Sequence, residues 1–584
     1  MSTTRRQFVQ SIPAFAVAGH MLMESHDAYA ATASFADDHF HPLGKAPSEF
    51  TKAVLRQARA SLPFGDKKDF EEQQKGFIAP MKDLKIIDDN GGVVWNMQQF
   101  QFIDQKDEFD SIHPSMHRIA KLNMNRRLFY QYGVLLPVNP YGYVTQGLGH
   151  GISRGNSGLI APTYVVEQDI EEIEVDGIRM IFQNTPNTEA PSEMNTYIPD
   201  MKALWMAENV NATLHNIYTL RGALVRDALS WSKYINEALY LYGQEAEVMF
   251  TAHHWPRWGN DRVQDILRSQ RDLYANFNNQ VLHLANQGVT INQIHNVFEL
   301  PKSLQQKWEC RGYHGSVEHN CRGVVNRFLG FWDCNPATLI PLSPEDSAPL
   351  YVEMMGGSAK ILARGKQLHD EGKYLLAQEV LNKLVQAEPN NQDAKNLLAD
   401  VFEQIGYQQE NPGLRNSFLA GAYELRSGIP QGASPKSSGP DVIRAMSTEL
   451  FLNFLGIRMD SRKAEGLKFT MNLITPDNGE KFVVELNNAT LTNLPGFLAE
   501  NPDLSLTINR SDLEQTMMGA KSLESQIQDG TAKVKGDVSI LAKLAATMVD
   551  FDPLFEIMPG TKVAPAEPEK ANPYEAVPGK TIVE

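Results

Sequence analysis

Two adjacent histidines, His253 and His254, are the strongest candidates for catalytic or metal-binding side chains, because their sequence neighbours restrict their positions. Trp255 and Pro256 follow at once, and Trp258 two positions later, so bulky or rigid residues fix the imidazole pair in one place. Neutral imidazoles and carboxylates can hold a metal ion that keeps one position open for water. The run is therefore a candidate for metal-assisted hydrolysis, although the two tryptophans also fit a role as packing anchors.

Three upstream runs supply carboxylates, another imidazole and an arginine. They are Thr188-Glu189-Ala190-Pro191-Ser192-Glu193-Met194, Met206-Ala207-Glu208-Asn209 and Leu214-His215-Asn216-Ile217-Tyr218-Thr219-Leu220-Arg221-Gly222. In this order, and with the run around His253, they resemble the alkyl sulfatases of the metallo-β-lactamase superfamily. The resemblance implies a zinc-dependent hydrolase that splits alkyl sulfate esters of the dodecyl sulfate type into alcohol and sulfate.

The same resemblance implies a role for each site residue, with two zinc ions per protomer. Glu189 would hold one zinc, Glu208 would lie between the two, and His253 would hold the other. His253 is favoured over His254 by alignment alone. Arg221 would bind the sulfate group, because its planar fork of donors matches two oxygens at once. The residues that could line the same pocket are His215, Asn216 and Tyr218.

The family's His-x-His-x-Asp-His motif, which supplies most zinc ligands, occurs nowhere in this sequence. Residues 122–125 match one part of the family sequence. The next residues, 126–133, match a part that lies well downstream in the family sequence. A segment near positions 125 and 126 is thus missing, and with it four ligands. An active sulfatase is one interpretation. A member without catalysis, acting as an amphiphile-binding or dimeric scaffold protein, and an incomplete gene model are the others.

The remaining histidines form no recognisable ligand spacing. His39 and His41 precede Pro42 and lack the Asp-His half of the motif, His113 and His117 are separated by Pro114, and His150 stands alone in a glycine-rich loop. We expect none of them to replace the missing ligands.

Length and charge limit the class of protein. A chain of 584 residues exceeds what one core can hold, so about three domains are expected. The formal net charge of −16 argues against nucleic acid as a partner.

Residues 1–30 have the features of a twin-arginine signal peptide, with Arg5 and Arg6 and an Ala28-Tyr29-Ala30 cleavage site. This predicts a periplasmic or secreted protein. No later run of the sequence reaches the roughly 18 apolar residues that a membrane helix needs, so we expect no transmembrane segment.

The three cysteines, Cys310, Cys321 and Cys334, show no Cys-x-x-Cys spacing, which makes a zinc–thiolate site improbable. Buried free thiols are favoured over a disulfide between two of them.

The resemblance implies a catalytic domain over residues 31–310, and hydrophobic patterning within it predicts an α/β fold. Residues 164–182 alternate as strands around an Asp176-Gly177 hairpin turn, and residues 223–242 and 263–285 show helical spacing before Gly288. Strands covered by helices fit the αββα sandwich that the resemblance implies, here incomplete.

Two smaller domains follow. Residues 311–428 contain a tetratricopeptide-like repeat beginning near Gly365, and the resemblance makes this all-α domain the homodimer interface. After a linker at 429–440, residues 441–560 are predicted as an α+β domain similar to sterol carrier protein 2, with strands at 467–473, 482–486 and 504–508 and a helix at 541–548. Residues 561–584, rich in Pro and Glu, are expected to be a disordered tail.

Overall fold

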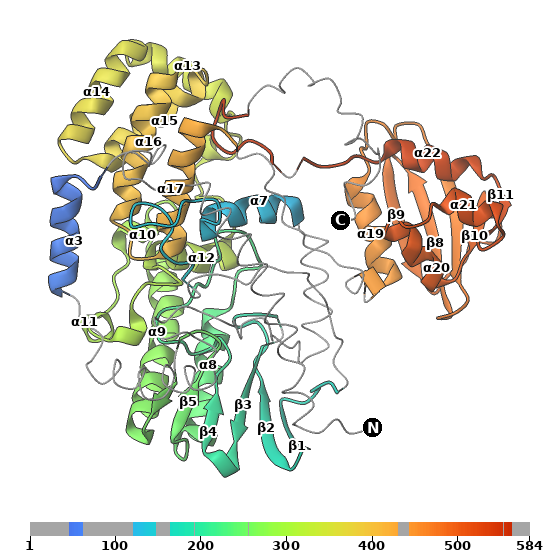
Figure 1. The fold of residues 1–584 in the computed structure, drawn as a ribbon, viewed down its shortest axis with the longest axis horizontal. Coiled ribbons are helices and arrows are strands. Elements are labelled where there is room, and N and C mark those ends of the chain that lie inside the picture. Colours follow the sequence, from blue (N-terminus) through green and yellow to red (C-terminus); the bar gives the residue numbers. More distant parts are fainter. Residues whose placement is uncertain are drawn as a thin grey trace, which may run out of the picture.

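The computed structural model describes residues 46–61, 121–147, 164–429 and 443–562, apart from positions 192, 255, 445 and 553. Within these ranges the chain has three apolar cores, which belong to the three bodies seen in Figure 1. Several predictions lie outside the described residues. They are the signal peptide, the tail after residue 562, most of the linker, and His39, His41, His113, His117 and His150.

The first body is built on a six-stranded sheet in which each strand pairs with the next along the chain. The strands are β1 Ile170–Val175, β2 Ile178–Asn184, β3 Met194–Ile198, β4 Ala203–Trp205, β5 Val248–Phe250 and β6 Arg257–Trp258. The predicted hairpin is confirmed, because β1 and β2 are antiparallel and join through Asp176 and Gly177, at φ of 51° and 79°. These residue types tolerate the left-handed conformation that a tight hairpin turn needs.

Helices α8, Ala228–Ala238, and α9, Asn260–Asn286, pack on each other next to this sheet (Figure 1). Trp231 of α8 stacks on Tyr274 of α9 at 4.4 Å between ring centroids, and neither side chain is exposed. The helix predicted from residue 223 begins later, because the Asp227 side chain caps it by accepting from the Leu229 and Ser230 amides. Its end continues into the π-helical turn η5, Leu239–Gly243.

Short helices complete this body. They are η4 Pro199–Met201, α10 Ile294–Val297, α11 Lys302–Gln305, η6 Trp308–Cys310, α12 Val317–Leu329 and η7 Pro336–Thr338. The described residues of this body contain one sheet, and the second sheet of an αββα sandwich is not among them. The α/β class is therefore confirmed, while the sandwich stays a prediction.

Helix α7, Lys121–Tyr132, runs without a break across positions 125 and 126, where the family segment is missing. Arg126 is 1% exposed and forms an ion pair with Glu424, which also accepts a hydrogen bond from the Tyr130 hydroxyl at 2.7 Å. The Arg126 Nε donates to the Phe555 carbonyl oxygen at 2.8 Å. The junction is thus a packed helix that ties the helical body to the C-terminal segment.

The second body is all helical. Its helices are α3 Glu49–Ser61, α13 Pro344–Met354, α14 Ser358–Asp370, α15 Tyr374–Ala387, α16 Gln392–Tyr407 and α17 Pro412–Ser427. The last four form the two predicted helical hairpins. Gly365 of α14 lies so close to Leu381 of α15 that an added Cβ would meet its Cδ2 at 2.6 Å, which explains the glycine of the repeat.

The third body is an α+β domain with a five-stranded sheet in the order β11-β10-β7-β8-β9. Its elements are α19 Thr448–Arg458, β7 Phe469–Thr475, β8 Glu480–Asn487, β9 Thr490–Pro495, β10 Leu504–Thr507, α20 Arg510–Met517, α21 Leu523–Gln528, β11 Lys533–Gly536 and α22 Ser539–Thr547. The three predicted strands and the predicted helix are confirmed as β7, β8, β10 and α22. The edge strands β9 and β11 were not predicted, because neither sequence repeats apolar residues at every second position.

Among the described helices, none combines the length and the apolar character needed to cross a membrane. The cysteines are free thiols, of which Cys310 and Cys321 are buried as expected. Cys334 is exposed, so the prediction of a buried thiol was wrong there.

Candidate metal centre

The strand directions bring the predicted ligands together. Strands β2, β4 and β5 run the same way, since β3 is antiparallel to β2 and β4, and β4 is parallel to β5. Their carboxyl ends therefore meet at one edge of the sheet, and the loops that follow them carry Glu189, Glu208 and His253.

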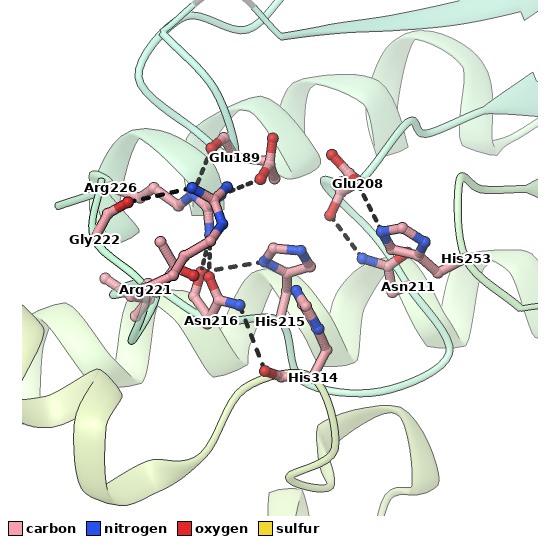
Figure 2. A network of polar contacts seen from close by, with 12 residues as sticks. Glu189, Glu208, Asn211, His215, Asn216, Arg221, Gly222, Arg226, His253 and His314 are labelled. Carbon is pink, nitrogen blue, oxygen red and sulfur yellow. Dashed lines mark hydrogen bonds and ion pairs between the residues drawn. The ribbon is translucent and has the colours of Figure 1, made fainter. Parts of the chain in front are cut away.

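His253 and Glu208 are in direct contact. The Nε2 of His253 lies 2.6 Å from Oε1 of Glu208, and the His253 side chain is 6% exposed (Figure 2). Neither ring nitrogen of His253 has a hydrogen-bond partner of ordinary geometry. A buried imidazole with unused nitrogens beside a carboxylate is a donor set suited to a metal ion.

His215 completes this cluster from the loop between β4 and α8. It is 1% exposed, and its ring lies parallel to that of His253 at 6.3 Å between centroids. Its Nδ1 donates to the carbonyl oxygen of Asn216 at 3.1 Å, since a carbonyl can only accept. The Nε2 of His215 is thereby left as a lone-pair donor.

His254 occupies a different environment from His253. Its backbone adopts a φ of 74°, and its ring lies 6.1 Å from that of Tyr313. The structure therefore brings His253, rather than His254, against Glu208.

Glu189 forms a buried ion pair with Arg226, the two side chains being 15% and 9% exposed (Figure 2). Arg226 also donates to the carbonyl and the side-chain oxygens of Asn216, the former at 2.8 Å. Sequence reasoning missed Arg226. Arg226 directly precedes Asp227, the residue that caps α8. This position could have indicated that Arg226 lies at the end of the loop that leads into α8.

Arg221 and Tyr218 lie on the side of the loop that faces α7. The Nη1 of Arg221 contacts the sulfur of Met124 at 3.1 Å and the carbonyl oxygen of Gly222 at 3.2 Å. The Tyr218 hydroxyl accepts from Arg127 at 3.3 Å. Within the described part of the chain, neither side chain is hydrogen-bonded to the carboxylates. Burial raises the pKa of Glu189, and the charge of Arg221 offsets only a small part of that rise.

His314 is a further imidazole that the sequence did not single out. Its ring centroid lies 4.4 Å from that of His215 and 5.8 Å from that of His253. The loop that carries it pairs with the loop of His215, since Leu214 donates to the Arg311 carbonyl and Gly315 donates to the Leu214 carbonyl, both at 2.8 Å. Only this long-range pairing could have revealed it.

Burial sets the protonation of the site. It raises the pKa of Glu189 to about 7, against the opposing charge of Arg226. Burial acts the same way on Glu208, but the neighbouring His253 holds the pKa of Glu208 below its usual range. Burial also lowers the pKa of His215 and His314 well below the ordinary value, so both rings are neutral at pH 7, the form that binds metals.

Among the described residues, two groups of side chains could hold a cation, and they share Glu208. One is Glu208, His215 and His253, and the other is Glu189, Glu193 and Glu208, with the ligand atoms of each group within 4.8 Å of one another. The first mixes imidazole and carboxylate, as zinc prefers, whereas the second has carboxylates alone and faces Arg226. The described residues fit one zinc ion and do not fit two.

Comparisons with known proteins identify the family. Residues 290–428 match the domain family described as "Alkyl sulfatase dimerisation", and residues 436–560 match "Alkyl sulfatase C-terminal". The chain is 31% identical to the alkyl/aryl-sulfatase BDS1 of Saccharomyces cerevisiae, over 87% of this chain and 95% of the relative. The chain belongs to the alkyl sulfatase family. The resemblance found in the sequence is thereby confirmed.

Two further comparisons agree. This alkyl sulfatase family member is 42% identical to a linear primary-alkylsulfatase of Pseudomonas sp., over 75% of this chain but only 65% of that relative. The stereoselective inverting sec-alkylsulfatase Pisa1 from Pseudomonas sp. shares the fold with a TM-score of 0.80 at 30% identity, covering 89% of this chain and all of that structure. The fold of the family is therefore preserved over the described bodies.

Proposed function

We propose that this chain hydrolyses the sulfate esters of alkyl chains, of the dodecyl sulfate type, to an alcohol and inorganic sulfate, with zinc as its metal. The observation that carries the proposal is the buried contact between Glu208 and His253, which leaves the His253 nitrogens without ordinary hydrogen bonds. The names of the relatives as alkylsulfatases support the substrate class.

Different residues of the site bind the sulfate group, hold the metal and transfer a proton. Arg221 binds the sulfate group with two parallel donors, and His215 and Tyr218 lie in the same loop beside it. Glu208 and His253 would hold the metal, which when bound supplies Lewis acidity that polarises sulfate oxygens and lowers the pKa of water. We assign to the neutral ring of His314, whose centroid lies 4.4 Å from that of His215, the role of accepting a proton during the reaction.

Sulfate release from dodecyl sulfate by the purified zinc-loaded protein tests this function. We expect turnover that a chelator abolishes, and a loss of about 100-fold in kcat/KM for Arg221→Ala, because a charge-assisted contact to the sulfate disappears. A matched control is Arg179→Ala, since Arg179 lies on β2 and is half exposed. No sulfate release from esters of any chain length would refute the proposal.

A second function, amphiphile binding without catalysis, is favoured by the absence of the His-x-His-x-Asp-His motif and by the pairing of Glu189 with Arg226. Calorimetric titration with dodecyl sulfate separates the two functions. Binding without sulfate release would support the scaffold protein, whereas binding with release supports the hydrolase.

We also propose that the protein is a homodimer, is exported by the twin-arginine route and acts in the periplasm. The match of residues 290–428 to a dimerisation family supports the homodimer. The Arg5-Arg6 motif and the cleavage site at Ala30 support export. Within the first body we propose the αββα arrangement of the superfamily, and for the third body a fold similar to that of sterol carrier protein 2.

A further inference from the structure

We propose that this chain binds one divalent metal ion rather than the family's two, that Glu208, His215 and His253 are its protein ligands, and that Arg226 stands in for the second cation beside Glu189. The inference deepens the proposed function, because it names the metal stoichiometry of the same site. It differs from the prediction made from the sequence at two residues, since Glu189 leaves the ligand set and His215 joins it.

The donor atoms support a three-ligand site. The ligand atoms of Glu208, His215 and His253 lie within 4.8 Å of one another, and those of a tetrahedral zinc lie about 3.3 Å apart, so small rotations close the site. Three protein ligands leave a fourth position open, as in catalytic zinc sites.

His215 is oriented for this role by its surroundings. Its Nδ1 donates to the Asn216 carbonyl, the kind of contact that fixes the ring of a metal-binding histidine and presents the other nitrogen. Its own carbonyl accepts from Asn320 at 3.0 Å, and its amide donates to the Tyr274 hydroxyl at 3.3 Å. Both partners are fully buried, so the ring is held from several sides.

Arg226 supplies the positive charge that a second metal ion would otherwise bring to Glu189. Its guanidinium cannot lose its proton in a protein, and it contacts Glu189 through both the carboxylate and the backbone carbonyl. Arg226 is further anchored on Asn216, so moving it aside would break contacts at two residues. The carboxylate that the resemblance assigns to the first zinc is therefore already neutralised by a fixed cation.

Metal counting on three variants tests the inference. The apoprotein and its His215→Gln, His253→Gln and Glu189→Gln variants are equilibrated with Zn²⁺ and, separately, Co²⁺, and bound metal is measured by mass spectrometry and by the visible absorption of Co²⁺. We expect one ion per chain in the natural protein and in Glu189→Gln. We expect at least tenfold weaker binding in His215→Gln and His253→Gln.

A matched control is His319→Gln, which removes a buried imidazole that caps α12 and lies outside the cluster. It should keep one ion per chain. Thermal unfolding of each variant shows whether it is folded, and if His215→Gln is not, Glu189→Gln and the stoichiometry of the natural protein still decide. Two ions per chain with one lost in Glu189→Gln would overturn the inference, and so would no uptake by the natural protein.

The counting is done without substrate, so its failure differs from failure of the proposed function. One ion per chain without sulfate release supports this inference and removes the hydrolase proposal. Sulfate release with two ions per chain overturns the inference alone.

Discussion

The Arg226–Glu189 ion pair concentrates two opposite charges where little water reaches them. Removing one partner of a buried pair leaves the other without compensation, which is more costly than losing a surface pair. We expect Arg226→Met to lower the free energy of unfolding by about 3 kcal/mol, measured by urea denaturation of the metal-free protein.

The control for that variant is Lys366→Ala, since Lys366 pairs with Asp370 on α14 and both are more than half exposed. It should change the free energy of unfolding by less than about 0.5 kcal/mol. Equal effects of the two substitutions would show that Arg226 is not a buried structural cation.

The cysteines differ in reactivity. Burial raises the pKa of the Cys310 thiol well above its usual value and that of Cys321 to about 12, so neither offers a thiolate near pH 8. Cys334 is exposed. We expect one thiol per chain to react rapidly with a colorimetric disulfide reagent at pH 8 in the native protein, and three after denaturation. Rapid reaction of all three in the native state would contradict the packing around η6 and α12.

Two paired loops, at residues 214–216 and 311–316, hold His215 against His314. Gly315 lies so close to the first loop that an added Cβ would meet the His215 carbonyl oxygen at 2.4 Å. We expect Gly315→Ala to weaken Zn²⁺ binding by about tenfold without removing a ligand, because the backbone of His215 must shift. Competition with a chromophoric chelator measures this change.

Gly456→Ala serves as the comparison, since an added Cβ on this residue of α19 meets only the Leu491 carbonyl oxygen at an ordinary 3.6 Å. Its zinc affinity should equal that of the natural protein. An unchanged affinity in Gly315→Ala would show that the loop pairing does not position His215.

The whole molecule exposes large apolar side chains along one stretch of the region that matches the dimerisation family. They are Phe328, Leu329, Phe331, Ile340, Leu342 and Met354, each at least 51% exposed. Large apolar side chains left exposed on a single chain are often covered by a partner protein. We expect Ile340→Asp, at the most exposed position, to convert a dimer into monomers in analytical ultracentrifugation, with thermal unfolding of the monomer still cooperative.

An exposed apolar residue of the third body, Phe497 at 61%, provides the control. Phe497→Asp should leave the dimer intact. Monomers in the natural protein at micromolar concentration would contradict the proposed homodimer.

The sequence by itself determined the elements whose signals are local. The Asp176-Gly177 turn, the periodicity of α9 and the helical hairpins of α14–α17 follow from neighbours within a few residues, so the patterns predicted them correctly. The family could be predicted as well, because several short runs occur in family order. Boundaries set by side chains, such as the start of α8 at its Asp227 cap, were missed by a few residues.

The tertiary structure alone decided the composition of the site. Arg226 meets Glu189 from 37 positions away, and His314 reaches His215 only because their loops pair across the fold. Such contacts depend on strand order and direction, which put the carboxyl ends of β2, β4 and β5 at one edge, and no local pattern encodes them. The sequence thus determined which chemical groups were available, and the fold decided which of them meet, since distance in space is set by long-range packing.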